Sequence, residues 1–299
     1  MRQLSRILYF LGLIIVINGR GTVIHAQPPE VPGQTAPATQ RQAEREAMER
    51  IAQVFNKPED LKFLAVDIVG HPLDAATLTV VEQEIRRVRG NLTLEVNDIS
   101  VERNPDGQTA SVMVGASLKN YLLSSTQYEK LSLRHQEDKW LVVPGDPKQV
   151  FADPQVGTLL RLATLIAEPQ ASLQAAWQEA SAASIKQLEI GLLQFLEDTN
   201  HKFTTTPETF AKDIQPYLGS DQLFYSPADK SGNMSYRLNT ALIGRTFPRI
   251  QHPDTTVMVY EGHDGELSFV HNGRAVVGFA DGHVMLVDQE QAKTLRWKP

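Results

Sequence analysis

Apolar residues recur first at helical spacing and then at every second position in the N-terminal half of the chain. Helical spacing covers 43–55 and 78–88, and the alternation that follows predicts strands separated by polar turns. The strands are expected near 92–101, 111–117, 128–135 and 140–143. Because helices followed by an antiparallel meander are typical of α+β modules, we place an α+β domain at 42–147.

The C-terminal half repeats this order with one long helix. No proline occurs between residues 171 and 200, and apolar residues form one continuous helical face there. That face consists of Ile185, Leu188, Leu192 and Phe195. A stretch rich in proline and glycine predicts a linker at 148–157, and the second α+β domain follows at 158–299. Its antiparallel meander is expected near 256–260, 266–270, 274–279 and 283–287.

The N-terminus has the pattern of a secretory signal. Arg2 and Arg6 precede an apolar run of 11 residues at 7–17. This run is shorter than the roughly 20 residues of a membrane-spanning helix, so we predict a cleaved signal peptide at 1–26. An uncleaved membrane anchor and a buried core helix are the alternatives. Residues 27–41 are mostly Pro, Gln, Thr and Ala, which predicts a disordered linker.

Charge and cysteine content exclude several classes of function. The chain has 299 residues and a net charge of −6, so it lacks the basic footprint of a nucleic-acid-binding protein. Removing the three arginines of the signal would leave 26 basic residues against 35 acidic ones, a charge of −9. The absence of cysteine excludes a disulfide framework, a thiolate metal site and a cysteine nucleophile.

The stretch FVHNGRAVVGFADGHVMLV contains two turn signals around one apolar run. Asn272-Gly273 and Asp281-Gly282 both tolerate the positive φ of tight turns, so they predict strand, turn, strand, turn, strand. A catalytic pair of His271 and Asp281 would need hydrogen-bond contact. A regular strand at 274–279 would instead hold them roughly 20 Å apart. We therefore predict two structural turns and no catalytic site.

A second grouping of polar residues lies in the turns of the same meander. His263, Asp264, Asp281 and His283 carry the ligand types that bind divalent ions. In a regular meander the turns at 261–265 and 281–282 would share one end of the sheet. They would still lie about 10 Å apart, across two strand spacings of about 4.8 Å. We therefore predict no bound metal. If a metal site were present, these four residues would be its candidate ligands.

Several segments around these turns occur in a recognisable order. The helix IKQLEIGLLQFLEDTNHKF is followed by LFYSPAD, SYRLN, HPDTTVMVYEG and then His271, nine residues and Asp281-Gly282. This order resembles the prepilin-type processing-associated H-X9-DG domain, a pseudopilin-like family in which a long helix lies on a small antiparallel sheet. The resemblance covers about 180–290. The motif positions are His271, Asp281 and Gly282, and the flanking positions are Pro227, Asp229 and Asn239.

Two further comparisons with families shape the expected function. The family usually begins with a prepilin leader, in place of which we expect a secretory signal here, and Ser226 stands where the family often has a cysteine. These departures imply use of the domain outside the pilus fibre. In the first domain, the order of elements and the segment EDKWLVV at 137–143 resemble the nuclear-transport-factor-like cone fold, in which a curved sheet wraps a helix.

Together these features predict an exported, non-enzymatic protein of the cell envelope. We expect a structural or protein-binding role linked to secretion or surface assembly, with envelope or secretion-system proteins as partners. We expect no cofactor, no nucleic acid, and membrane contact only if the signal is not cleaved. The expected location is periplasmic, cell-surface or secreted. The alternative is an exported small-ligand-binding protein or enzyme that uses a pocket in the cone-like domain.

Overall fold

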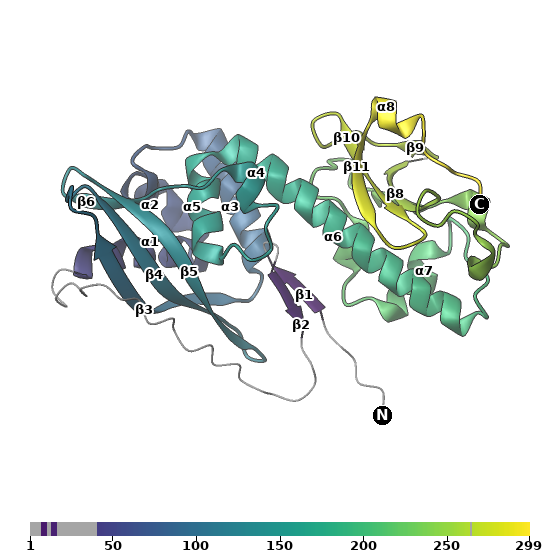
Figure 1. The fold of residues 1–299 in the computed structure, drawn as a ribbon, viewed down its shortest axis with the longest axis horizontal. Coiled ribbons are helices and arrows are strands. Elements are labelled where there is room, and N and C mark those ends of the chain that lie inside the picture. The colour runs from purple at the N-terminus through teal and green to yellow at the C-terminus, as the bar shows by residue number, and fades with distance from the viewer. Residues whose placement is uncertain (1–6, 11–12, 17–40, 264) are drawn as a thin grey trace. The chain divides into compact units, whose positions relative to one another are not determined.

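The computed structural model describes residues 7–10, 13–16, 41–263 and 265–299. The chain divides into two compact units, Met1–Ala175 and Ala176–Pro299, and Figure 1 shows their helices and strands. Helices and antiparallel sheets occur together in the chain, which confirms the predicted α+β class. Among the described residues, no helix has both the length and the apolar character needed to cross a bilayer.

The predicted signal peptide and linker lie mostly outside the described residues. The described part of the apolar run forms two short antiparallel strands, β1 (Ile7–Phe10) and β2 (Leu13–Val16). The cleavage site and nearly all of the predicted linker at 27–41 fall outside the described ranges. The signal peptide therefore stays a prediction.

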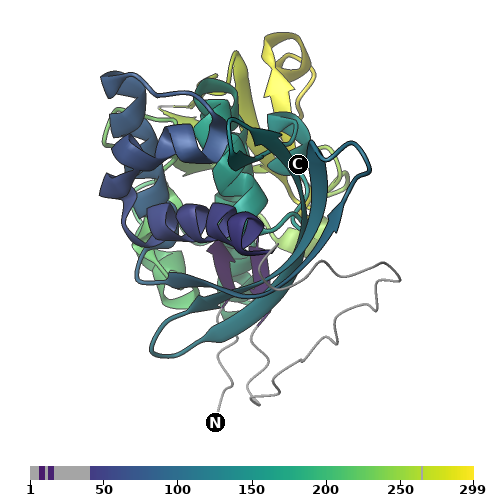
Figure 2. The same cartoon turned by 90° about the vertical axis from the view of Figure 1, so that its left-hand side faces the viewer.

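The first unit is built on a four-stranded antiparallel sheet in the order β3-β4-β5-β6. The strands are β3 (Thr93–Arg103), β4 (Thr109–Lys119), β5 (Ser124–Gln136) and β6 (Lys139–Val142). Figure 2 shows the sheet curving around the helix α1 (Gln42–Asn56). Buried residues of both elements, including Phe55, Leu94 and Val112, form the core between them. The helix-then-meander order follows the prediction closely.

Helices α2, α3, α4 and α5 complete this unit. Because α5 belongs to it, the boundary between the two units lies later in the chain than the predicted linker. Their bounds are α2 (Leu61–Val69), α3 (Ala75–Arg89), α4 (Pro147–Val150) and α5 (Thr158–Ala167). The carboxylate of Glu129 on β5 accepts hydrogen bonds from Leu159 N at 3.0 Å and Leu160 N at 3.3 Å. It thereby satisfies amide groups at the start of α5 that the helix itself leaves free. Because α5 is fastened to the first sheet, the division after Ala175 differs from the predicted linker at 148–157.

The second unit packs the C-terminal part of the long helix α6 (Pro169–Asp198) on an antiparallel sheet. The strand order is β11-β10-β8-β7, with β9 paired to β8. The bounds are β7 (Tyr236–Leu238), β8 (Val257–His263), β9 (Glu266–Leu267), β10 (Arg274–Phe279) and β11 (Val284–Asp288). The short helices are α7 (Phe210–Ile214) and α8 (Gln289–Ala292). On α6, the predicted apolar face is buried at three positions, but Leu196 is buried where Phe195 was expected.

The pairing of β10 corrects the predicted simple meander. Strand β10 pairs directly with β8, with Val277 opposite Tyr260 and Phe279 opposite Val257. The two-residue β9 pairs only with the end of β8, so it does not separate β8 from β10. Because β8 and β10 are antiparallel neighbours, the turn after β8 lies near the start of β10. It therefore lies at the opposite end of β10 from Asp281-Gly282.

The C-terminal residues cover the other face of this sheet. Val257 N donates to Arg296 O at 2.9 Å, and Trp297 packs edge-on against Tyr260 with ring centroids 5.1 Å apart. Trp297 joins an apolar cluster with buried residues of β8 and β10, such as Val277. Both faces of the sheet are thus packed, one by α6 and the other by the tail and the loop after β9.

Candidate functional site

The first turn of the motif has the predicted geometry. His271 N donates to Arg274 O at 3.0 Å, and Arg274 N donates to His271 O at 3.1 Å. The two central residues have positive φ, 51° at Asn272 and 78° at Gly273, as a type I′ hairpin turn requires. The turn leads directly into β10.

The side chain of His271 has a role that sequence reasoning missed. It is completely buried, and its Nε2 lies 3.0 Å from Glu261 Oε2. Glu261 is equally buried on β8, and its carboxylate also accepts a hydrogen bond from Val276 N at 3.2 Å. The pair therefore joins the start of β10 to β8 inside the unit. A signal was present in the sequence, because Glu261 interrupts the apolar run VMVYEGH, and a charge in a buried strand requires a partner.

The second turn of the motif, at the other end of β10, is held by hydrogen bonds between its own residues. Gly282 has a φ of 86°, which favours glycine. Asp281 Oδ1 accepts hydrogen bonds from His283 N at 3.0 Å and from His283 Nδ1 at 2.6 Å. Burial acts to raise the pKa of Asp281, but these bonds and the His283 charge outweigh it and lower the pKa. The predicted separation is confirmed, because β10 lies between His271 and Asp281.

Two residues of α6 lie beneath the second turn, and one is unusual. Lys186 Nζ donates to the carbonyl oxygen of Gly282. One turn further along, Glu189 is buried, and neither carboxylate oxygen has a hydrogen-bond partner among the described residues. A Cβ at Gly278 would lie 2.2 Å from Glu189 Oε1, so only glycine leaves room for this carboxyl group. Burial raises the pKa of Glu189 to about 8, with Lys186 opposing the shift and Asp281 adding to it.

The candidate metal cluster does not assemble. His263 Nε2 lies 3.0 Å from Asp229 Oδ2, whereas His283 pairs with Asp281 at the other end of β10. The prediction that the two turns share one end was wrong, because β8 and β10 run in opposite directions as neighbours. Asp264 lies outside the described residues. Within the described ranges, no group of three or more His, Cys, Asp or Glu side chains is arranged to hold a metal ion.

The three flanking positions also make contacts within the fold. Asn239 is buried, and its Nδ2 donates to Val257 O and Trp297 O, both at 2.8 Å, which ties the tail to β8. Asp229 accepts hydrogen bonds from Ser231 N at 2.8 Å and from Ser235 Oγ at 2.9 Å. The carbonyl of Pro227 accepts from the Lys230 ammonium at 3.2 Å in the same loop.

The position of the family cysteine is occupied by a buried hydroxyl group. Ser226 Oγ lies 2.9 Å from Ser181 Oγ on α6, and Ser226 N donates to Ser235 Oγ at 2.9 Å. The phenol of Tyr236 is buried beside these serines, and this burial, reinforced by the charge of Glu261, raises its pKa. Hydrogen bonds therefore fasten this loop to α6 without a disulfide.

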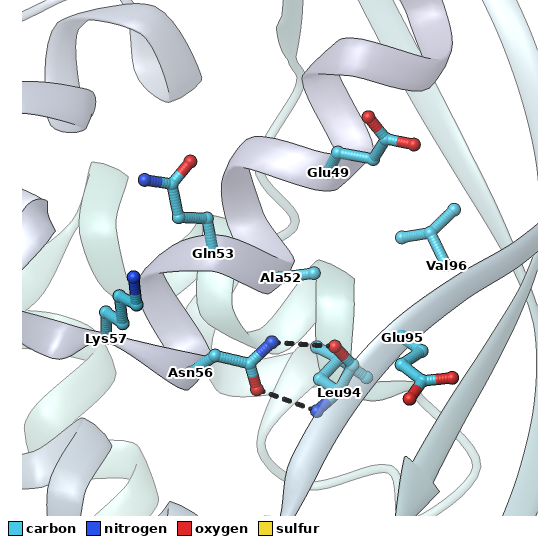
Figure 3. Close-up of a pocket in the computed structure, with 8 residues that line it drawn as sticks. All are labelled: Glu49, Ala52, Gln53, Asn56, Lys57, Leu94, Glu95 and Val96. Atoms are coloured by element: carbon cyan, nitrogen blue, oxygen red, sulfur yellow. Dashed lines mark hydrogen bonds between the residues drawn. The ribbon is translucent and has the colours of Figure 1, made fainter.

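The first unit has a shallow hollow of about 430 Å³ between α1 and β3, shown in Figure 3. Most of the polar side chains that line it already have partners. The Asn56 amide bonds to both N and O of Leu94 at 2.9 Å, which caps the outer edge of β3. Gln53 donates to Asp60 at 2.7 Å, and Glu95 pairs with Lys119. Few polar groups are left to bind a small molecule.

These contacts define a two-unit α+β protein. In the second unit, the motif and flanking residues fasten the sheet to α6 and to the C-terminal tail. Comparison with protein-family models finds no match to this chain, and comparison with curated proteins finds none either.

Proposed function

We propose that this chain is an exported, non-enzymatic protein of the cell envelope that binds other proteins through a pseudopilin-like scaffold. The observation that supports this most directly is the burial of His271. Its Nε2 lies against Glu261, and the ring has no solvent-exposed surface. A general acid or base must come within hydrogen-bond reach of its substrate, so a sealed histidine supports a structural role for the motif.

Further support comes from the way the motif is anchored at both ends. His271 joins the start of β10 to β8, and Gly282 receives a hydrogen bond from Lys186 on α6. The domain thereby holds one helix and one sheet in a fixed arrangement. Such a rigid body suits the presentation of surfaces to partners.

Export is tested with a C-terminal fusion to alkaline phosphatase in a bacterial host. The phosphatase needs disulfides that form outside the cytoplasm. We expect an active fusion with the complete chain and an inactive one after deletion of 1–26. An inactive fusion of the complete chain would contradict export.

Partner binding is tested by photo-crosslinking in intact envelopes. A crosslinking residue replaces Phe63 in the first unit or Met285 in the second, because both side chains are exposed. We expect adducts with envelope proteins from at least one site, and none when buried Leu192 carries the crosslinker. Adducts absent from both exposed sites would argue against a protein-binding role.

The alternative of a small-ligand site rests on the hollow between α1 and β3. Lys57 supplies an exposed positive charge at its rim. Since Gln53, Asn56 and Glu95 are already engaged, the hollow offers weaker support than the sealed motif offers for the scaffold.

A further inference from the structure

The longest hairpin of the first unit ends in two exposed apolar side chains. Strands β4 and β5 pair along their whole length up to Lys119 and Ser124. At the tip, Tyr121 is 83% exposed and Leu122 is 62% exposed. Among the described residues, no other consecutive pair of large apolar side chains is this exposed.

The turn that carries these side chains is fixed by hydrogen bonds. Asn120 Oδ1 accepts from Leu122 N and from Leu123 N, both at 2.8 Å. Asn120 N donates to Leu123 O at 2.9 Å. Asn120 Nδ2 also reaches Asn91 Oδ1 at 3.5 Å, between α3 and β3. The tip is thus held in one conformation with both apolar side chains directed into solvent.

The charge around the tip differs from that of the whole chain. The chain carries 35 acidic residues, yet 109–127 contains none and has Lys119 as its one basic residue. Glu95 lies on the neighbouring strand β3, opposite Ser117, and is paired with Lys119. The last turn of α3, which ends just before Asn91, carries three arginines, of which Arg86 pairs with Glu59 and Arg87 pairs with Glu84. The tip and its surroundings thus carry little net charge, so an anionic surface repels this end less than it repels the acidic chain as a whole.

We propose that the β4–β5 tip inserts Tyr121 and Leu122 into the interfacial layer of an anionic phospholipid bilayer. Two exposed side chains offer far less surface than the roughly 800 Å² that each partner contributes to a standard protein interface. Leu123 is half-buried, and Asn120, Ser124 and Ser125 are polar, so the apolar patch at the tip stays small. A bilayer needs no such patch, and tyrosine is favoured at the membrane–water interface because its ring is amphipathic. The proposal rests on the envelope location proposed above, and deepens it.

The test uses the absence of cysteine from the chain. The variant Leu122→Cys is labelled with the fluorophore NBD and mixed with vesicles of phosphatidylglycerol and phosphatidylcholine in equal parts. We expect a blue shift of emission and quenching by brominated lipid. A label at Phe63→Cys, which is 70% exposed on α2, is the matched control and should not respond. The position-specific label separates the tip from any binding by the N-terminal apolar run.

A second variant measures the contribution of the two side chains. Tyr121→Ser with Leu122→Ser should weaken vesicle binding at least about tenfold, since each apolar side chain contributes on the order of 1 kcal/mol or more. Unchanged circular dichroism would show that the unit still folds. A silent Leu122 label, as expected if the tip instead docks into a protein pocket, would overturn the proposal. So would equal responses at Leu122 and Phe63. An inactive phosphatase fusion would refute the export proposal without changing these vesicle results.

Discussion

Replacing Glu189 by glutamine should stabilise the second unit, and should do so more as the pH rises. Glutamine has nearly the same shape, so it still fits against Gly278, but it cannot ionise. Burial raises the pKa of Glu189 from 4.5 to about 8 in the folded protein. The stability associated with the protonated group is therefore fully present below pH 4.5 and is lost as the pH rises through 8.

The magnitude follows from the size of the shift. At pH 7 the unfolded chain ionises Glu189 and the folded chain keeps it protonated, which costs the folded state about 3 kcal/mol at roughly 1.4 kcal/mol per pH unit above 4.5. Glu189→Gln should raise the free energy of unfolding at pH 7 by up to about this amount. That is a large fraction of the roughly 5–15 kcal/mol of an ordinary domain. At pH 4 the variant and the wild type should be nearly equal.

The assay is urea unfolding between pH 4 and 9, followed by hydrogen-exchange mass spectrometry. Peptides from β10 and β11 assign the transition to the second unit. Glu197→Gln, at an exposed position on the same helix, is the matched control and should show no such pH dependence. A Glu189→Gln difference that stays constant from pH 4 to 8 would refute the reasoning, because it would mean that Glu189 ionises normally in the folded protein.

Three other substitutions probe the remaining contacts. Gly157→Ala places a Cβ within about 2 Å of the Glu129 carboxyl group and should cost the first unit about 1–3 kcal/mol, seen as a lower melting temperature; an unchanged temperature would mean that the carboxyl group moves freely. His271→Ala and Glu261→Ala should each cost about 3–5 kcal/mol because each leaves a buried polar partner. The double variant should cost less than the sum, and strict additivity in a double-mutant cycle would show that the pair does not interact. Trp297→Ala should cost about 1–3 kcal/mol, because the ring is only partly buried, and should expose the tail to carboxypeptidase; an equally resistant tail would contradict its docking on β8.

The sequence predicted the positions of strands and turns better than it predicted which strands pair with each other. The turn at Asn272-Gly273 was predicted because positive φ is a local requirement. The direct pairing of β8 with β10 was missed because strand order depends on contacts between distant segments. Leu61–Val69 was missed as a helix because its nine residues are too short and too apolar to show a clear period. Glu189 was missed because one carboxylate in an apolar face was not treated as a core position.

The spacing of the motif has a mechanical reason in this fold. Nine residues separate His271 from Asp281, and they hold the two-residue turn, the six residues of β10 and one more residue. One end of this segment is fixed to β8 by the pair of His271 and Glu261, and the other is fixed to α6 by Lys186 and Gly282. Because successive residues of a strand face opposite sides of the sheet, one residue more or fewer in β10 would break one of the two contacts. Either His271 would turn away from Glu261, or the Asp281-Gly282 turn would turn away from Lys186 on α6. A fixed distance between a histidine and an Asp-Gly turn can therefore arise from sheet register alone, without any chemistry between the two residues.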